Sequence, residues 1–319
     1  MKIGNGTTEW FKTNVGVRQG CTLSPDLFNL FLEKILTLAI GENLEGLKLN
    51  GTTVNNLRFA DDIALISDSP QGLQQLTEEV NEKSLQFGLR INIDKTKVMK
   101  SGVQNTSLNI KVQDDYLEQV ENFVYLGGKI NQSGKDDTDI SRRIGLASMA
   151  FGKMTKIWRS REMTWNTKRR VYETIILPVL LYGSECWTLR KADEDKLLMM
   201  EMGWLRVILG VSRLQRLRNE EVRKMIGLKS TVVERIQERR LRWFGHVSRM
   251  DINRLPNKAL HMKVMGRRNR GRPRMRWIDK IKEDIKSKLE TSGQTMESAL
   301  GLTKERDKWR AFIRPHRHR

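Results

Sequence analysis

The chain has 319 residues and a formal net charge of +20, from 58 Lys and Arg against 38 Asp and Glu. Hydrophobic residues make up 38% of it, enough for packed cores, and the length allows roughly two domains. No apolar run approaches the ~18 residues of a membrane span, and the first residues form no basic-then-apolar leader. We therefore expect neither a membrane nor a secreted protein, but an intracellular one, nuclear or cytoplasmic. Cys21 and Cys186 are too few for a disulfide framework or a zinc set.

The charge is divided unevenly along the chain. Residues 1–140 hold 14 Lys and Arg and 19 Asp and Glu, a net charge of −5, whereas residues 141–319 hold 44 and 19, a net charge of +25. So basic a half indicates a polyanionic partner, most often nucleic acid. Seven of the eight tryptophans also lie after residue 140, and rings mixed with cations suit unpaired strands. The alternative is a helical protein with a solvated basic surface.

The first predicted helix begins at Ser24-Pro25-Asp26, with Ser24 as the N-cap, proline at the first helical position and an acid in the first turn. Apolar residues recur at helical spacing until residue 41, and further leucines make the helix apolar nearly all round, which predicts that it is buried. Two short apolar runs over residues 54–60 and 63–67 follow, and only Asp61-Asp62 separates them. These runs predict a hairpin.

A second helix is predicted from Ser69-Pro70, with inward apolar side chains that extend as far as Phe87. A strand is predicted over residues 89–93, and a hairpin over residues 123–130 that turns at Gly127-Gly128. The acidic part is therefore predicted to be mixed α/β, in the order helix, hairpin, helix, strand, hairpin.

After about residue 138 the pattern predicts helices. One helical face carries the apolar side chains of Ile140, Ile144, Ala147, Phe151 and Trp158. Arg142 and Arg143 lie off that face and are candidates for nucleic-acid contacts. Asn166 is the predicted cap of a helix that runs to residue 181 and bends at Pro178. Further helices are predicted over residues 192–209, 219–227 and 230–250, and from Trp277 onward.

The Asp61-Asp62 pair has an unusual context for a turn. A two-residue hairpin connection prefers glycine at one of its central positions, and this corner has none. Two adjacent carboxylates between buried strands repel each other unless a cation lies on them. Mg²⁺ prefers such oxygens and often bridges to substrate phosphates, so the pair predicts a metal site. A solvent-facing acidic turn is the alternative.

Four segments, one of which contains this pair, occur in a fixed order along the chain. They are Gly16–Pro25, Phe59–Asp62, Gly88–Asn92 with Lys95–Lys97, and Tyr125–Lys129. Together they resemble the reverse transcriptase of non-LTR, LINE-type retrotransposons, from the second conserved motif of the palm onward. Residues 180–187, 242–246 and 271–274 are similar to downstream segments of endonuclease–reverse transcriptase polyproteins of animal elements, so the resemblance covers essentially the whole chain.

This resemblance implies an α+β fold: a partial right-hand polymerase palm of helix, antiparallel hairpins and helix, followed by an all-α thumb. Residues 1–137 would form the partial palm and residues 138–215 the helical thumb or connection. Residues 216–319 would form a basic, helical nucleic-acid-binding region with an arginine-rich arm at 266–276. The implied partners are an RNA template and a DNA primer or their hybrid, with a deoxynucleoside triphosphate if the chain is active.

The resemblance also implies roles for particular residues. Asp61 and Asp62 would be the catalytic pair that binds Mg²⁺ or Mn²⁺, and Lys95 (or Lys97) would lie near the leaving pyrophosphate. Template and incoming nucleotide would be positioned by Arg18, Gln19 and Gly20. The primer grip would be the hairpin segment of Tyr125, Leu126, Gly127 and Gly128.

One departure from the family concerns the N-terminus. The family has another carboxylate motif upstream, and here the only acid before residue 16 is Glu9. We therefore expect an N-terminally truncated polymerase fragment without its fingers or its third metal ligand, which does not polymerise DNA by itself.

The arm after residue 266 has three interpretations. Its arginines are Arg267, Arg268, Arg270, Arg272, Arg274 and Arg276. Such a composition favours an extended segment, and we favour a linker that contacts phosphates without sequence preference. A nuclear import signal is the second interpretation, and an AT-hook-like insertion of Arg270-Gly271-Arg272 into an A/T minor groove is the third.

Three hypotheses about the whole chain remain open. The first is a fragment of a retrotransposon RNA-directed DNA polymerase. The second is a non-catalytic RNA- or DNA-binding protein derived from such an element. The third is a translated pseudogene without a stable fold, because a palm that lacks strands exposes sheet edges.

Overall fold

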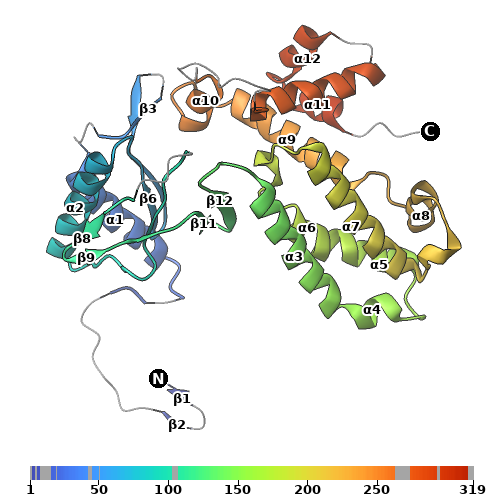
Figure 1. Cartoon of the computed structure of the whole chain (residues 1–319), viewed down its shortest axis with the longest axis horizontal. Coiled ribbons are helices and arrows are strands. Elements are labelled where there is room, and N and C mark those ends of the chain that lie inside the picture. The colour runs from blue at the N-terminus through green and yellow to red at the C-terminus, as the bar shows by residue number, and fades with distance from the viewer. Residues whose placement is uncertain are drawn as a thin grey trace. The chain divides into compact units, whose positions relative to one another are not determined.

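The computed structural model divides into two compact units, Met1–Val98 with Thr106–Gln119, and Met99–Asn105 with Val120–Arg319 (Figure 1). The sequence analysis predicted the first domain boundary after residue 137. In the structure the hairpin at 122–131 belongs to the same unit as the helices that follow it. The residues that the structure describes are 2–3, 6–7, 16–18, 20–41, 45–49, 51–102, 107–262, 274–292 and 295–314.

Unit 1 contains two helices and a series of small two-stranded ladders. Its helices are α1 (Ser24–Ile40) and α2 (Pro70–Gln86). Its antiparallel ladders are β1 (Lys2–Ile3) with β2 (Gly6–Thr7), β3 (Leu47–Leu49) with β4 (Thr52–Val54), β5 (Asn56–Phe59) with β6 (Asp62–Leu65), and β8 (Lys111–Val112) with β9 (Asp115–Tyr116). β7 (Lys97–Val98) pairs in parallel with β10 (Glu118–Gln119). The mixed α/β prediction for this part of the chain is confirmed at that level.

The start and the burial of α1 both differ from the prediction. Leu23 is the N-cap, and Ser24 is the first helical residue, whose hydroxyl donates a hydrogen bond to the Arg18 carbonyl at 2.8 Å. One face of α1 packs on α2, and its buried residues there include Leu36. The opposite face is open: Leu30 is 70% exposed. Apolar residues all round α1 therefore do not make it a buried helix, because the other elements of unit 1 cover only one of its faces.

Helix α2 and the segment after it follow the predicted pattern in part. Ser69 caps α2 by accepting a hydrogen bond from the Gly72 amide, as predicted. Phe87 is exposed at the C-terminus of α2 and meets Phe31 edge to face, so its predicted inward position is wrong. Residues 89–93 form no ladder, yet alternate side chains, among them Ile91, pack against the cores of unit 1.

Unit 2 begins with the hairpin of β11 (Asn122–Tyr125) and β12 (Gly128–Asn131) and is otherwise helical. Its helices are α3 (Asp137–Lys153), α4 (Thr155–Arg159), α5 (Trp165–Val171), η1 (Tyr172–Ile176), α6 (Leu177–Leu180), η2 (Ser184–Cys186), α7 (Lys191–Leu209), η3 (Arg213–Gln215), α8 (Asn219–Ile226), α9 (Val232–Ser248), α10 (Leu255–Leu260), α11 (Trp277–Ser292), α12 (Met296–Leu302) and α13 (Arg306–Ile313). The predicted change to helices is confirmed.

The larger core of unit 2 lies among α3 to α9, and α3 and α7 run side by side in Figure 1. The predicted apolar face of α3 is confirmed, with Ile140, Ala147 and Phe151 buried. The predicted cap at Asn166 is wrong, because the side chain of Thr164 accepts the hydrogen bond from the Thr167 amide.

The helix before Pro178 widens instead of bending simply. Residues Tyr172–Ile176 form a π-helical turn, and the Leu177 amide donates to the Tyr172 carbonyl. Proline lacks an amide hydrogen, so an ordinary α-helical register cannot continue through it, and a π-bulge is one way to accommodate that loss.

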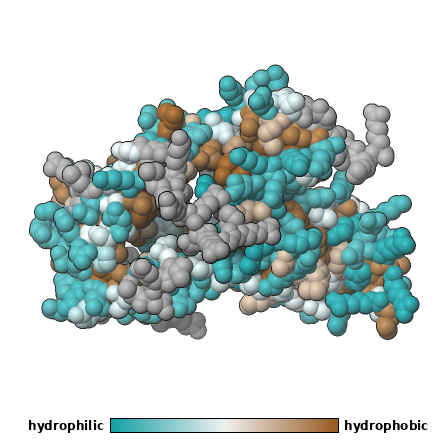
Figure 2. Space-filling model, turned by 45° about the horizontal axis from the view of Figure 1, so that its top comes forward, coloured by the Kyte–Doolittle hydropathy of each residue, from teal (hydrophilic) through white to brown (hydrophobic). Residues whose placement is uncertain are grey.

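A second core joins α9, α11, α12 and α13 around Leu241, Ile285 and Trp309, all buried. The face that Figure 2 shows carries mostly hydrophilic side chains among its coloured residues, with hydrophobic ones in separate patches. Among the described helices of the chain, none combines the length and the apolarity that crossing a bilayer requires.

Candidate active site and nucleic-acid interface

The predicted metal-binding pair lies at the turn of the β5–β6 hairpin. Phe59 pairs with Asp62, so the turn residues are Ala60 and Asp61, and Ala60 adopts a positive φ of 51° in place of the usual glycine. Both carboxylates are exposed, and within the described part of the chain neither has a hydrogen bond or an ion pair. Phe59 is 64% exposed, so the prediction of buried strands on both sides is wrong for β5, although Ile63 packs against the core of α1 and α2.

These two side chains fit a hard divalent cation in their chemistry. Mg²⁺ in proteins is bound by one or two carboxylates together with substrate phosphates and water, and two adjacent acids without a protein cation supply such a pair. Across the described residues, no cluster of three or more His, Cys, Asp or Glu side chains is placed to hold a metal ion.

The same local geometry occurs a second time in unit 1. In the β8–β9 hairpin, Val112 pairs with Asp115, and the turn residues are Gln113, with a positive φ of 57°, and Asp114. Asp114 and Asp115 are also exposed. Turn geometry alone therefore does not single out Asp61-Asp62, and the motif around that pair is what distinguishes it.

The other predicted residues of unit 1 lie on loops. The Arg18 side chain is exposed, while its carbonyl accepts hydrogen bonds from the Cys21 amide and the Ser24 hydroxyl ahead of α1. Gly20 has a positive φ of 85°, which favours glycine, and Gln19 lies outside the described residues. Lys95 is exposed, and none of the described contacts joins it to the Asp61-Asp62 pair.

The predicted primer-grip segment forms the turn of the β11–β12 hairpin in unit 2. Tyr125 pairs with Gly128, so the turn residues are Leu126 and Gly127, one position earlier than predicted. Their φ angles of 47° and 78° are both positive, as a type I′ turn requires. A Cβ at Gly127 would also lie 3.3 Å from the Tyr182 ring, so glycine fits both the conformation and the contact.

The two carbonyls of this turn are held by side chains from the helices. Tyr182 donates its hydroxyl hydrogen to the Leu126 carbonyl at 2.8 Å. Arg142 donates to the Gly127 carbonyl at 3.0 Å, and Arg143 donates to the same oxygen. Arg143 also lies 4.4 Å over the Tyr182 ring and is buried, so it is a positioning residue for the turn in this structure.

Asp139 holds the other side of the hairpin. Its carboxylate, buried in α3, accepts hydrogen bonds from the Lys129 amide at 2.9 Å and from the Trp187 indole at 2.9 Å. Arg143 lies 3.9 Å from the same carboxylate. Burial lowers the pKa of Arg143, and the negative charge of Asp139 opposes that shift.

The segment 181–187 connects this hairpin to the C-terminal helices. The Leu181 carbonyl accepts from Arg239 at 2.9 Å, and the Trp187 carbonyl accepts from Arg240 at 2.7 Å, both on α9. Trp277 at the start of α11 donates to the Glu185 carbonyl at 2.8 Å. The sequence analysis found a family resemblance in residues 180–187 and predicted no role for them. For the contacts of Asp139 and Arg143 on α3, the sequence signal is their spacing of four residues, which is typical of a helical ion pair.

Only the end of the predicted arginine arm is described. Arg267, Arg268, Arg270 and Arg272 lie outside the described residues, and so does the centre of the proposed AT-hook. Arg274 donates to the carbonyls of Ser133, at 2.7 Å, and of Gly134, in the turn after β12. The exposed Arg276 directly precedes α11, and its amide donates a hydrogen bond to the Asp279 carboxylate at 3.1 Å.

Comparison with known proteins supports the motif-based interpretation. The family model described as reverse transcriptase (RNA-dependent DNA polymerase) matches residues 1–130. A transposon-derived protein of Caenorhabditis elegans is 30% identical over 278 residues, which cover 84% of this chain and 98% of that protein.

Two retrotransposon polyproteins are more distant relatives. The Pol polyprotein from the type-2 retrotransposable element R2DM of Drosophila melanogaster is 27% identical across 60% of this chain and 19% of its own length. The Pol polyprotein from the type-1 element R2 of Popillia japonica is 24% identical across 57% of this chain and 30% of its own length. The chain thus spans nearly all of the worm protein and less than a third of each of these polyproteins. It belongs to the reverse transcriptase family of non-LTR, LINE-type retrotransposons.

Proposed function

We propose that the chain is part of a retrotransposon RNA-directed DNA polymerase and binds an RNA template with a DNA primer, or their hybrid. The observation that carries this proposal is the Asp61-Asp62 pair, exposed at a hairpin turn within the residues that the reverse transcriptase model matches. Both acids lack a protein cation among the described residues, which is the state expected of metal ligands.

In this proposal each candidate residue has one task. Asp61 and Asp62 would hold Mg²⁺ or Mn²⁺, which when bound neutralises charge on the triphosphate of the incoming deoxynucleotide. Arg18, with Gln19 and Gly20, would contact the template and that nucleotide. Lys95, an exposed cation on a loop, would lie near the leaving pyrophosphate.

The hairpin turn at Leu126 and Gly127 would contact the primer through its backbone. Its carbonyls are already engaged by Tyr182, Arg142 and Arg143, which supports a rigid turn that offers amides and the strand edge to a ligand. Rigid placement is what positioning a primer end requires, since small displacements of a reacting group reduce the rate steeply.

We further propose that this chain does not extend a primer by itself, because two-metal catalysis needs more ligands than one acidic pair provides. A second candidate function is a nucleic-acid-binding protein without catalysis, favoured by the net charge of +25 over residues 141–319. A nuclear or cytoplasmic location agrees with either function and stays a prediction.

Two measurements on the full chain test these proposals. Primer extension on an RNA template with Mg²⁺ or Mn²⁺ should give no product, and extension that Asp61→Asn abolishes would refute the inactive assignment. Titration with Mn²⁺, followed by its paramagnetic resonance signal, should show binding that the double variant Asp61→Asn and Asp62→Asn removes.

The β8–β9 turn supplies the matched control for the titration. The double variant Asp114→Asn and Asp115→Asn changes two acids in the same turn geometry and should leave Mn²⁺ binding intact. Equal loss in both double variants would mean that any exposed acidic turn of this chain binds the ion, and the metal assignment would fail. RNA binding that persists without Asp61 and Asp62, together with absent extension, favours the non-catalytic function.

A further inference from the structure

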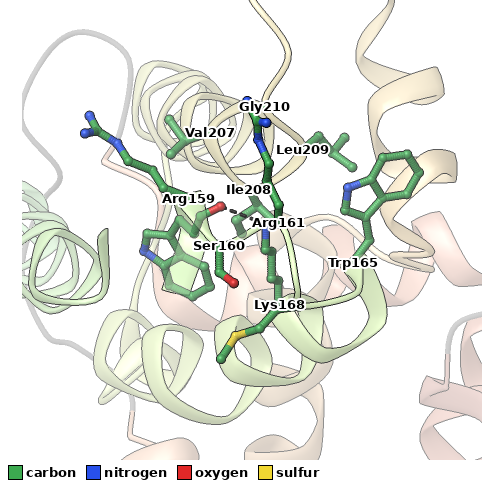
Figure 3. A pocket seen from close by; sticks show the side chains of 11 residues that line it. Arg159, Ser160, Arg161, Trp165, Lys168, Val207, Ile208, Leu209 and Gly210 are labelled. Atoms are coloured by element: carbon green, nitrogen blue, oxygen red, sulfur yellow. Dashed lines mark hydrogen bonds between the residues drawn. The ribbon is translucent and has the colours of Figure 1, made fainter. Parts of the chain in front are cut away.

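A pocket lies within unit 2, and none of its lining residues belongs to the β11–β12 hairpin. It has a volume of about 470 Å³ and lies between the α4–α5 connection and the C-terminus of α7 (Figure 3). Its lining includes Arg159, Arg161, Trp165 and Lys168 on one side and residues 207–210 on the other. The volume is within the range of small-ligand sites, roughly 300–1,000 Å³.

The pocket is lined by cations without a matching acid. No Asp or Glu is among its lining residues, and among the described residues Arg159, Arg161 and Lys168 have no ion pair. Lys168 is 6% exposed, and its ammonium donates one hydrogen bond, to the Trp158 carbonyl at 2.8 Å. An ammonium has three N–H groups, so two donors of a buried cation lack a protein acceptor in the described part of the chain. Burying such a group is costly unless a ligand supplies acceptors, and an anion does so best.

An aromatic surface lies at the edge of the same pocket. Trp165, the first residue of α5, is 47% exposed, and its ring lies across the pocket from the Arg159 side chain (Figure 3). The other tryptophan of the lining, Trp158, is 2% exposed, stacks on Phe151 and donates its indole hydrogen to the Phe151 carbonyl. Trp158 therefore belongs to the core, and Trp165 is the ring available to a ligand.

We propose that this pocket binds one unpaired nucleotide of a nucleic-acid strand, with the base stacked on Trp165 and the phosphate on Lys168 and Arg161. Stacking on an aromatic ring and cations on the phosphate are the two elements by which proteins hold single strands without sequence preference. A free nucleotide carries the same groups, but a strand adds further phosphates, which the exposed Arg159 beside the pocket can contact. This site shares no residue with the proposed polymerase site and does not depend on its metal pair.

The test is a binding titration of the full chain with a labelled single strand of about 12 nucleotides, and with the same strand lacking its bases. Trp165→Ala should weaken binding of the normal strand about tenfold and leave the abasic strand unchanged, whereas Trp165→Phe should retain most of the affinity. Arg161→Ala should weaken both strands, because its contact is to phosphate. Arg213→Ala changes an exposed arginine outside the pocket and is the matched control.

Several results of these titrations would overturn the proposal. Wild-type affinity in both Trp165→Ala and Arg161→Ala would overturn it, and so would an equal loss of normal and abasic strands in Trp165→Ala. Mononucleotides should compete only weakly, and a mononucleotide that binds as tightly as the strand would overturn the assignment to a strand. The variant Asp61→Asn with Asp62→Asn should keep the full effect of Trp165, which separates this site from the proposed polymerase function.

Discussion

The ion pair between Arg240 on α9 and Asp284 on α11 gives a strong quantitative prediction for the stability of unit 2. Arg240 is 1% exposed and Asp284 is 4% exposed, and two N–H groups of the guanidinium donate to the two carboxylate oxygens at 2.6 and 3.0 Å. A third guanidinium hydrogen reaches the Trp187 carbonyl at 2.7 Å. Replacing Arg240 by methionine keeps most of the volume but leaves a buried carboxylate without its cation.

The expected cost follows from that burial. Removing one partner of a buried, hydrogen-bonded pair destabilises a protein by about 3–5 kcal/mol. For a unit of this size that corresponds to a fall in Tm of about 6–20 °C. The double variant Arg240→Met with Asp284→Leu removes both charges and should recover most of the loss, because well-packed apolar pairs often replace buried ion pairs at little cost.

The loss should also depend on pH. Burial raises the pKa of Asp284, while the hydrogen bond and charge of Arg240 oppose that rise. The Asp284 carboxyl therefore keeps its proton to a higher pH in the folded chain than in the unfolded chain. As the pH rises from the ordinary pKa of the carboxyl to its pKa in the folded chain, the free energy of unfolding falls. Without Arg240 the folded pKa moves higher, and Arg240→Met should cost more at about pH 7.5 than at about pH 5.

Urea unfolding followed by tryptophan fluorescence measures these differences, since seven of the eight tryptophans lie after residue 140. The reasoning is refuted if Arg240→Met costs less than about 1 kcal/mol, which is the range of an exposed pair. It is also refuted if the cost is independent of pH, or if the double variant is no more stable than Arg240→Met.

Two substitutions and one comparison of cysteine reactivity test separate features. Tyr182→Phe should destabilise the hairpin by about 0.5–1.5 kcal/mol and speed hydrogen exchange of its turn amides, and unchanged exchange would show that the hydroxyl does not hold the turn. Gly245→Ala should cost more than about 1 kcal/mol in chemical unfolding, because a Cβ there would overlap the Trp309 ring, and a neutral result would contradict that contact. Hydrogen bonds, led by one from a backbone amide, lower the pKa of Cys21, whereas desolvation and the negative charge of Glu185 raise the pKa of Cys186 to about 11. Both cysteines are exposed, so at about pH 8 the difference in pKa should make Cys21 react with iodoacetamide faster than Cys186. The reverse order in single-cysteine variants would contradict these environments.

Local signals in the sequence predicted elements well and burial less well. The cap at Ser69 and the apolar face of α3 follow from spacing and capping chemistry alone, and the structure confirms them. The hairpin predicted over residues 123–130 also forms, with its turn one residue earlier than predicted. The burial of α1 did not follow, because Leu30 has apolar neighbours in sequence but no element over it in unit 1. Periodicity reports which faces are apolar, and only the other elements of the fold decide which of those faces are covered.

The charge count did not reveal that some arginines of unit 2 are buried. The charge of residues 141–319 predicted a polyanionic partner, yet Arg143 and Arg240 are buried and donate hydrogen bonds within the chain, to the hairpin turn, to Asp284 and to Trp187. Their partners lie far away in sequence or are backbone carbonyls, neither of which a charge count reveals. Lysines and arginines that remain exposed, such as Arg161 at the pocket, are the ones that a polyanion can reach.

The β11–β12 hairpin and the acidic pair differ in how strongly the fold restricts their residues. The hairpin glycine at 127 has a positive φ and lies against Tyr182, so the fold itself restricts this position whether or not a primer is ever bound. Asp61 and Asp62 are exposed, and their carboxylates form no hydrogen bond or ion pair with a described side chain, so folding places no comparable demand on them. An intact hairpin motif in this chain therefore indicates a folded helical unit and says little about catalysis. Substitutions at the acidic pair should change metal binding without changing stability, and for that reason they are the informative test of the enzyme hypothesis.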